Sequence, residues 1–257
     1  VMFGFMGFLD DFIKVKKKHN EGLTVMQKIV IQVLIIAAYF ATLYLSGMTR
    51  TAILFPWGWT WELGWLYYPI MGVVILYLVN AVNLTDGLDG LATGVSVPIV
   101  AVLGVLAYLS GHIVYADYLN IMYIPGSGEM VVFAAALVGA LVGFLWYNSF
   151  PAQIFMGDTG SLAIGGVIAV FALCIRKELL LPLLCGVFLV ESFSVMMQVG
   201  YFKYTKRKYG EGHRLLLMAP VHHHFQKKGQ FETKIVLRFW IISLLLAAIT
   251  LVTLKIR

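Results

Sequence analysis

Long runs of apolar residues, separated by short polar segments, make up most of this chain. A helix needs about 20 such residues to cross a hydrocarbon core of roughly 30 Å. Seven runs approach or reach that length, at residues 28–46, 66–82, 91–110, 129–147, 159–175, 179–201 and 235–254. These runs are continuous, whereas the strands of a membrane barrel alternate apolar and polar residues. The pattern therefore predicts an all-α, polytopic transmembrane helix bundle that forms one membrane domain over residues 1–257.

Composition agrees with residence in a membrane. Of the 257 residues, 60% are hydrophobic and 12% are charged, about half the charged share of a soluble domain. Cys174 and Cys185 lie inside apolar runs, which predicts buried thiols rather than a disulfide or a metal site. The apolar stretch 1–8 has neither the basic start nor the cleavage site of a signal peptide. It resembles the end of a helix, so we expect an N-terminal portion to precede this chain.

Basic residues predict the orientation of the bundle. If connections alternate between the two membrane sides, one side carries residues 9–27, 83–90, 148–158 and 202–234. Counted to the helix edge at Lys28, that side holds 13 of the 19 lysines and arginines, and the other side holds five. The positive-inside rule makes the first side cytoplasmic. Arg176 and Lys177, on the other side, run against the rule.

Polar chemistry collects on the predicted cytoplasmic side. Its acidic residues and clustered histidines are Asp10, Asp11, Asp86, Asp89, Asp158, His222, His223 and His224. The outer side has single, scattered acids and a tryptophan-rich segment, residues 55–65, that is typical of an interfacial aromatic belt. We therefore expect the functional site on the cytoplasmic side.

Two motifs pair aspartates. Asp10 and Asp11 are followed by Lys14 and further lysines, and a solvated helix end balanced by these lysines is the structural alternative to a site. Asp86 and Asp89 are spaced to share a helical face, and the glycines between and after them allow close approach to the backbone. Acids without a basic residue suit Mg²⁺ and phosphate oxygens, although a polar turn capped by aspartate has the same sequence.

Asp158 and a run of three histidines are the other candidates. Asp158 or Thr159 can cap the next helix, and a carboxylate at a helix N-terminus can also hold a metal against a diphosphate. Asp158 is our first choice as metal ligand. The histidines lack a second cluster with structural-zinc spacing. Imidazoles beside a diphosphate are the functional interpretation, and a basic loop on anionic headgroups is the structural one.

A polar stripe interrupts the run 179–201. Glu191, Ser194 and Gln198 recur at helical spacing toward the cytoplasmic end. Hydrogen bonds between helices explain such a stripe without any chemistry, but Gln198 is nearest to the predicted site.

Five segments together resemble the phospho-N-acetylmuramoyl-pentapeptide transferases, a branch of the polyprenyl-phosphate N-acetylhexosamine-1-phosphate transferases. They are GFLDDF at 7–12, NAVNLTDGLDG at 80–90, WYNSFPA at 146–152, FMGD at 155–158 and MAPVHHHF at 218–225. The aspartate motifs are shared across the superfamily, and the histidine segment points to the muramoyl branch. Gln226 stands where members usually have glutamate.

The resemblance implies a fold of ten helices, of which this chain would lack two and most of a third. It implies UDP-N-acetylmuramoyl-pentapeptide as donor and undecaprenyl phosphate as acceptor. Lipid I and UMP would be the products, in peptidoglycan synthesis, and Mg²⁺ the cofactor. The protein would lie among the lipids of the bacterial inner membrane with its active site on the cytoplasmic face. No nucleic acid is implied as a partner, and a homodimer is left open.

The resemblance also implies roles for individual residues. Those implied as catalytic are Asp10, Asp11, Asp158 and His222, with Asp158 as the Mg²⁺ ligand. Those implied as substrate-binding are Lys14, Lys18, Asn83, Asp86, Asp89, Asn148, Phe155, Gln198, His223 and His224. Lys14 and Lys18 would add positive charge, and Phe155 would stack on uracil beside Asn83 and Asn148.

Two mechanisms are open at this point. An aspartate of the Asp10–Asp11 pair could attack the donor, or the lipid phosphate could attack directly. The lipid phosphate is largely dianionic near pH 7, because its second pKa is about 6, so we favour direct attack. Repulsion within the pair is expected to raise one pKa, which would suit a base.

Two rival functions remain. A sister transferase that uses UDP-N-acetylglucosamine shares the aspartates but not the histidine segment. A transporter would be expected to have inverted repeats and a midplane site, whereas these acids gather at one membrane face.

Overall fold

The computed structural model describes residues 1–17, 22–47, 51–55 and 59–255. Helices account for most of this part of the chain, as the apolar runs predicted. They are α1 (Met2–Lys17), α2 (Val25–Leu45), α3 (Tyr67–Thr85), α4 (Leu91–Gly111), α5 (Ile113–Tyr118), α6 (Met130–Asn148), α7 (Gly157–Cys174), α8 (Leu181–Leu184), α9 (Gly186–Tyr209), α10 (Val221–Lys227) and α11 (Glu232–Thr253). Single 3₁₀ turns lie at η1 (Gly64–Leu66), η2 (Ser127–Glu129) and η3 (Glu178–Leu180).

Six helices in the described part of the chain are long and apolar enough to cross a membrane: α2, α3, α4, α6, α7 and α11. The predicted helical membrane bundle is confirmed. The prediction of one continuous helix over 179–201 is wrong, because η3 and α8 meet α9 at a bend of 76°. A Cβ on Gly186, just after the bend, would lie 2.8 Å from Leu246 Cδ1, so close packing on α11 accompanies this break.

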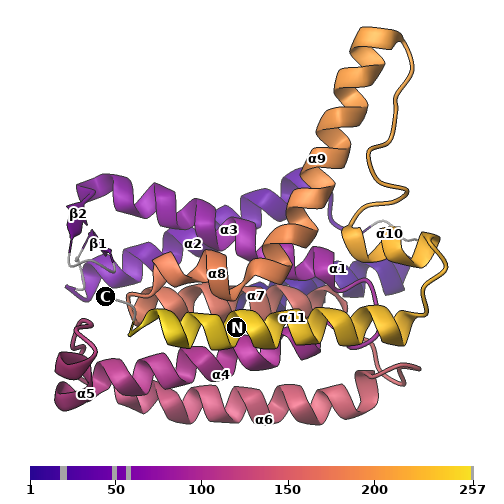
Figure 1. The fold of residues 1–257 in the computed structure, drawn as a ribbon. Helices are drawn as coiled ribbons and strands as arrows, with labels where there is room; N and C mark the ends of the chain where they lie inside the picture. The colour runs from indigo at the N-terminus through magenta and orange to yellow at the C-terminus, as the bar shows by residue number, and fades with distance from the viewer. Residues whose placement is uncertain (18–21, 48–50, 56–58, 256–257) are drawn as a thin grey trace.

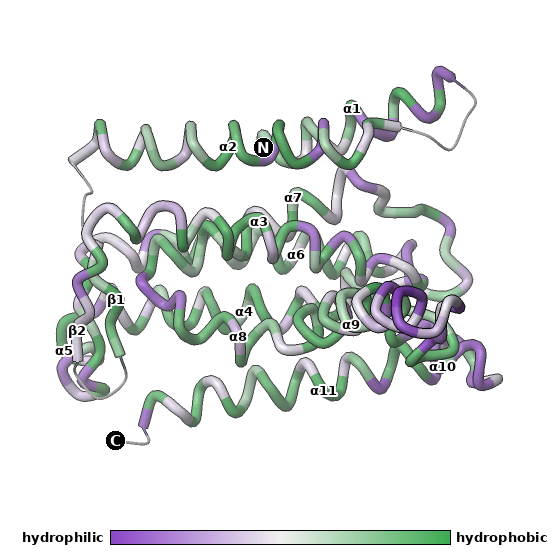
Figure 2. The backbone as a smooth tube through the Cα atoms, turned by 90° about the horizontal axis from the view of Figure 1, so that it is seen from above, coloured by the Kyte–Doolittle hydropathy of each residue, from purple (hydrophilic) through white to green (hydrophobic). Residues whose placement is uncertain are grey.

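Two helices form the centre of the bundle. α4 packs against α6 and α11, and α7 packs against α1 and α3. α2 and α6 bury the smallest shares of their apolar windows, so their outward faces are available to lipid. Figure 1 shows the spanning helices side by side, with α9 rising away from them beyond its bend. Figure 2 shows apolar residues along the helices and hydrophilic residues concentrated toward their ends.

A short hairpin, which the apolar pattern did not predict, lies at one end of the bundle. β1 (Ala52–Leu54) pairs antiparallel with β2 (Thr60–Glu62), with Ile53 opposite Trp61. Trp59, Trp61 and Trp65 are mostly exposed, as an interfacial belt requires. Residues 56–58 of the predicted belt lie outside the described residues.

The turn that carries Arg176 and Lys177 lies at the hairpin end, because η3 contacts β1. This turn therefore lies on the side that alternation of the connections predicts, although its two basic residues run against the positive-inside rule. Arg176 adopts a positive φ of 55° and donates a hydrogen bond of 3.1 Å to the Tyr67 hydroxyl. The free thiol of Cys185 is buried as predicted, whereas that of Cys174 is exposed.

Candidate functional site

Three aspartates meet at the end of the bundle opposite the hairpin. Asp10 and Asp11 lie on α1 and Asp158 lies in the first turn of α7, with one carboxylate oxygen of each within 4.8 Å of the others. Gly7, one turn before Asp10, makes this possible, because a Cβ there would overlap the Asp158 carbonyl group. Close contact of two backbones is a role that glycine alone can fill.

Two lysines neutralise these aspartates, and we call the five residues Asp10, Asp11, Lys14, Lys28 and Asp158 the carboxylate–lysine cluster. Lys14 Nζ lies 2.6 Å from Asp10 Oδ2 and 3.3 Å from Asp158 Oδ2. Lys28 Nζ lies 2.9 Å and 2.7 Å from the same two oxygens. In the sequence, Lys28 contributes to the charge count that predicts orientation, and no motif marks it as a site residue. Its position at the polar start of an apolar run was the available signal.

Asp10 is the buried member of the cluster. Its side chain is fully inaccessible, and its Oδ1 accepts a 2.6 Å hydrogen bond from the Leu23 N–H. Burial by itself raises its pKa, but hydrogen bonds donated by the two lysines and by that N–H favour the ionised form, and the pKa lies well below its usual range. Asp10 is therefore not the member of the pair whose pKa is raised by repulsion.

Lys14 is affected in the opposite sense. Burial lowers its pKa, but its contacts with Asp10 and Asp158 raise it by more. Both partners are therefore held in their charged forms around neutral pH. Contacts between ammonium and carboxylate groups, rather than repulsion between carboxylates, therefore determine the direction in which these two pKa values shift.

Asp11 is more accessible, with a third of its side chain exposed. Its Oδ2 accepts hydrogen bonds from the Thr159 N–H (3.1 Å) and hydroxyl (3.0 Å). Gly157, with a φ of 62°, leaves room for this carboxylate, since a Cβ there would lie 2.8 Å from Asp11 Oδ2. Among the described residues, the other oxygen, Oδ1, has a single long contact of 3.4 Å with Lys14. It is the carboxylate oxygen of the cluster best placed to meet a ligand.

Asp158 is held from both sides. Its Oδ1 accepts a 2.8 Å hydrogen bond from Asn83, whose amide also donates to Ser161 at 2.9 Å, and its Oδ2 faces the lysines. The helix-cap interpretation of Asp158 or Thr159 is wrong, because α7 begins at Gly157 and Met156 occupies the cap position. Asn83 therefore positions the predicted metal ligand.

Asp86 and Asp89 lie in a turn between α3 and α4 rather than on one helical face. The pKa of Asp86 is raised to about 7, chiefly by burial and then by the negative charges of Asp158, Asp11 and Asp89. Asp89 accepts the Ala152 N–H at 2.9 Å. Its own N–H donates to the Glu232 carboxylate at 2.9 Å. This turn therefore connects the start of α11 with the segment between α6 and α7.

The three histidines have different surroundings. His222 is fully buried and its Nδ1 lies 3.0 Å from Glu191 Oε2. His223 Nδ1 lies 2.7 Å from Gln226 Oε1, and His224 Nδ1 accepts the Leu217 N–H at 3.1 Å. The expectation that all three imidazoles line a diphosphate site is wrong for His222 in this conformation, because no surface of its ring is accessible.

The remaining predicted residues divide into two groups. Asn148 and Gln198 use their amides within the protein: Asn148 bonds to Thr93 and Ile154, and Gln198 to the backbone of residues 215–216. They hold loops beside the site. Phe155 is three-quarters exposed, which leaves its ring free for stacking. Lys18 lies outside the described residues.

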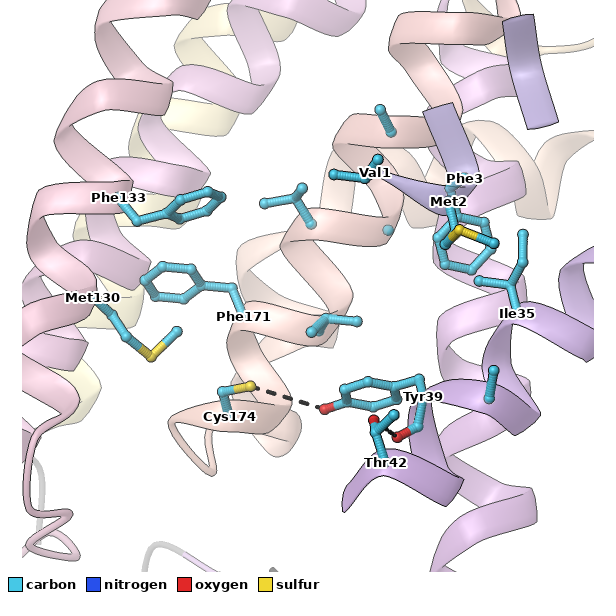
Figure 3. A pocket seen from close by; sticks show the side chains of 15 residues that line it. Val1, Met2, Phe3, Ile35, Tyr39, Thr42, Met130, Phe133, Phe171 and Cys174 are labelled. Carbon is cyan, nitrogen blue, oxygen red and sulfur yellow. Dashed lines mark hydrogen bonds between the residues drawn. The ribbon is translucent and has the colours of Figure 1, made fainter. Parts of the chain in front are cut away.

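An apolar pocket of about 400 Å³ lies apart from the cluster, between α1, α2, α6 and α7. Figure 3 shows Phe133 and Phe171 on one side and Phe3 and Ile35 on the other. The Tyr39 hydroxyl lies 3.9 Å from Cys174 Sγ. This lining is mostly apolar, with no charged side chain among the described residues that form it, and it suits a hydrocarbon chain.

Fold and site together define a polytopic membrane protein whose charged end can bind a cation and an anionic group next to each other. The profile described as "Glycosyl transferase family 4" matches residues 1–176, which include the whole cluster. Three proteins named phospho-N-acetylmuramoyl-pentapeptide-transferase are similar to this chain over nearly all of its length. That of Chlorobium phaeobacteroides is 53% identical, over 99% of this chain and 70% of its own length. Those of Parabacteroides distasonis and Flavobacterium psychrophilum are 48% and 46% identical, over all of this chain and 75% and 74% of their own lengths.

The chain therefore belongs to the phospho-N-acetylmuramoyl-pentapeptide transferase family, within glycosyl transferase family 4.

Proposed function

We propose that this protein transfers phospho-N-acetylmuramoyl-pentapeptide from its UDP-linked donor to undecaprenyl phosphate, giving lipid I and UMP. The observation that carries the proposal is the carboxylate–lysine cluster at one end of a membrane bundle. Its accessible Asp11 lies next to Asp158, and phosphoryl transfer needs charge neutralisation and positioning more than covalent chemistry. The names of the relatives supply the particular donor group.

Magnesium is the cofactor that the donor set fits. Asp11 and Asp158 offer carboxylate oxygens within reach of one another, and oxygen ligands are those that Mg²⁺ prefers. When bound, Mg²⁺ would offset the charge of the diphosphate and of the departing UMP. Because Asp158 Oδ2 contacts both ammonium groups, we propose that Asp158 binds the ion in exchange for one of those contacts.

The remaining roles follow from accessibility. Lys14 and Lys28 hold Asp10 and Asp158 in place, and Lys14, about a third exposed, can turn its charge toward a phosphate. Phe155 offers its open ring face to uracil. Undecaprenyl phosphate would approach from the lipid side with its chain along the apolar helix faces.

Direct attack by the lipid phosphate remains our preferred mechanism, now with a sharper assignment. Asp10 is a poor nucleophile and a poor base, because it is buried and bonded to two ammonium groups. Asp11 is the accessible carboxylate, and we assign to it the positioning or deprotonation of the acceptor phosphate.

The transfer is tested with purified protein, Mg²⁺, undecaprenyl phosphate and labelled UDP-N-acetylmuramoyl-pentapeptide. We expect one UMP released for each lipid-linked product, no turnover in chelator, and severe loss in Asp11→Asn and Asp158→Asn. UDP-N-acetylglucosamine is the matched donor control. Transfer from that donor alone would identify the protein as the sister transferase and reject our proposal.

A second experiment separates the two mechanisms. Labelled UMP is incubated with the UDP-linked donor and enzyme in the absence of polyprenyl phosphate. Direct attack predicts no exchange of label into the donor. Sustained exchange would require a covalent enzyme intermediate, and its survival in Asp11→Asn would place the nucleophile elsewhere.

A further inference from the structure

Two titratable side chains near the cluster end are buried and have no place in the chemistry above. Glu191 lies on α9 and His222 on α10, both side chains are fully buried, and Nδ1 of His222 lies 3.0 Å from Oε2 of Glu191. A carboxylate in an apolar helix is costly unless something compensates it. The contact with His222 compensates Oε2, whereas Oε1 is buried and has no hydrogen-bond partner among the described residues.

The contact determines how the imidazole is oriented. Glu191 Oε2 accepts from Nδ1–H, and the His222 backbone N–H also lies 3.4 Å from the same oxygen. The opposite ring nitrogen, Nε2, is buried and has no hydrogen-bond partner among the described residues. It points at Gly87, where an added Cβ would overlap Nε2. The ring therefore fills the space that the glycine leaves open.

Gly87 lies between Asp86 and Asp89, in the turn that faces the cluster. The imidazole thus connects three parts of the protein: α9 through Glu191, α10 through its own backbone, and this aspartate turn through Gly87. Its contacts are internal on every side, and its inaccessible ring leaves no face for a substrate.

We infer that Glu191 and His222 form a clamp that holds α10 against the Asp86–Asp89 turn, and that both are positioning residues rather than groups that touch the substrate. The inference rests on the proposed transfer for its catalytic readout. His222 was implied as catalytic by the family resemblance, and the clamp explains how its loss would impair turnover without any contact with the donor.

The length of α10 is the reason that a clamp matters. It has seven residues and no side-chain cap at its N-terminus, and an isolated helix so short is unstable in water. His223 and His224, on the same turn of helix, take their positions from it. Both rings are partly exposed, so displacement of α10 would move two accessible imidazoles away from the site.

A double-mutant cycle tests the contact between the ring and the glycine. Gly87→Ala should displace the imidazole and lower kcat by about tenfold or more, with the donor KM changed much less. His222→Ala should lower kcat similarly and leave the shape of its pH profile unchanged. His222→Ala removes the ring atoms that the new methyl group would overlap and leaves a contact of 3.3 Å with His223 Nε2. The double variant should therefore be little worse than His222→Ala. Gly139→Ala is the control, since a Cβ there meets nothing within 4 Å.

If kcat of the double variant falls by the product of the two single-variant factors, Gly87 and His222 act independently, and the clamp is rejected. Loss of one limb of the pH profile in His222→Ala would also overturn it, because that result would make His222 an acid or base in the reaction.

A second series tests Glu191 without using activity. Hydrogen–deuterium exchange is followed by mass spectrometry in peptides that cover residues 219–228. Glu191→Leu removes the acceptor and should accelerate exchange there, whereas Glu191→Gln keeps an oxygen acceptor and should accelerate it less. Equal exchange in wild type and Glu191→Leu would reject the clamp. If the wild-type protein makes no lipid product, the proposed function fails, but this exchange experiment still decides on the clamp.

Discussion

Two ammonium groups and two carboxylates share one small volume where α1, α2 and α7 meet. Asp10 Oδ2 and Asp158 Oδ2 each contact both Lys14 and Lys28. Loss of one lysine would leave two acids with a single cation, and one of those acids is fully buried. A buried charge that loses its partner destabilises a protein far more than an exposed one does.

Lys28→Gln tests this point. We expect the free energy of unfolding in detergent to fall by about 1–3 kcal/mol, the range for a lost hydrogen bond to a charged group, and transfer activity to fall with it. Lys16→Gln is the matched control, because Lys16 is an exposed lysine on α1. If Lys28→Gln and Lys16→Gln lower the free energy of unfolding and the activity equally, the contacts of Lys28 with the aspartates do not stabilise the protein.

Asp86 provides a pH-dependent prediction. Its pKa is raised to about 7 in the folded protein, so it keeps a proton that an unfolded aspartate releases near pH 4. Its effect on stability is therefore a loss that grows as pH rises from about 4 to 7. Over pH 6–8 it becomes negatively charged beside Asp158 and Asp11.

We expect the affinity of the site for Mg²⁺ to rise between pH 6 and pH 8, since the ion favours the ionised form of a nearby carboxylate. Titration calorimetry at pH 6, 7 and 8 measures this change. Asp86→Asn should flatten the pH dependence. A dependence that is equally steep in this variant would assign the titration to another group.

Phe155 is tested by binding of UMP. Phe155→Ala should weaken binding by about 1–3 kcal/mol, the range for a base stacked on an aromatic ring. Phe150→Ala is the matched control, because Phe150 is also exposed on the segment between α6 and α7. Unchanged UMP affinity in Phe155→Ala would exclude the ring from the uracil site.

At the scale of elements, the packing of α1 on α7 decides whether the cluster exists. Gly7 lies where the two backbones touch, and Asp10 and Asp11 follow within about one turn. The helical periodicity of α1 then points both acids toward the start of α7. A single methyl group at position 7 would have to push the helices apart.

Gly7→Ala should therefore reduce both stability and Mg²⁺ binding, with a cost of about 1–3 kcal/mol for overpacking. Gly143→Ala on α6 is the control, because a Cβ there lies in open space. Thermal unfolding with and without Mg²⁺ measures both effects. A normal stabilisation by Mg²⁺ in Gly7→Ala would show that this contact does not set the cluster geometry.

The bend between α8 and α9 and the hairpin β1–β2 show where element prediction from sequence failed. Residues 179–201 are apolar on both sides of the bend, so hydropathy could not detect it. Contact with α11 near Gly186 accompanies the change of direction. The hairpin strands have three residues each, too short for an alternating pattern to stand out from an aromatic segment.

At the scale of the whole molecule, the cluster and the hairpin lie at opposite ends of the bundle, and the positive-inside rule predicts that the cluster faces the cytoplasm. We expect Trp61→Cys to be labelled by a membrane-impermeant maleimide in intact cells. Lys227→Cys should be labelled only after permeabilisation. Both are made in a background with Cys174 and Cys185 replaced by alanine, which is the unlabelled control. Labelling of Lys227→Cys in intact cells would show that the cluster end faces outward, opposite to the predicted orientation.

The helical class, the approximate spans, the family and the end at which acids and histidines gather could all be read from the order of residues. Each depends on local quantities, namely the transfer free energy of about 20 neighbouring side chains or a short motif. Other features depend on residues far apart in sequence. Lys28 joins Asp158 across 130 positions, and His222 joins Glu191 across 31. Asp10 and Asp11 are neighbours with the same side chain, yet one is buried and the other partly exposed. Packing of α1 on α7 makes that distinction, because burial and hydrogen-bond partners belong to the folded arrangement and not to any one segment.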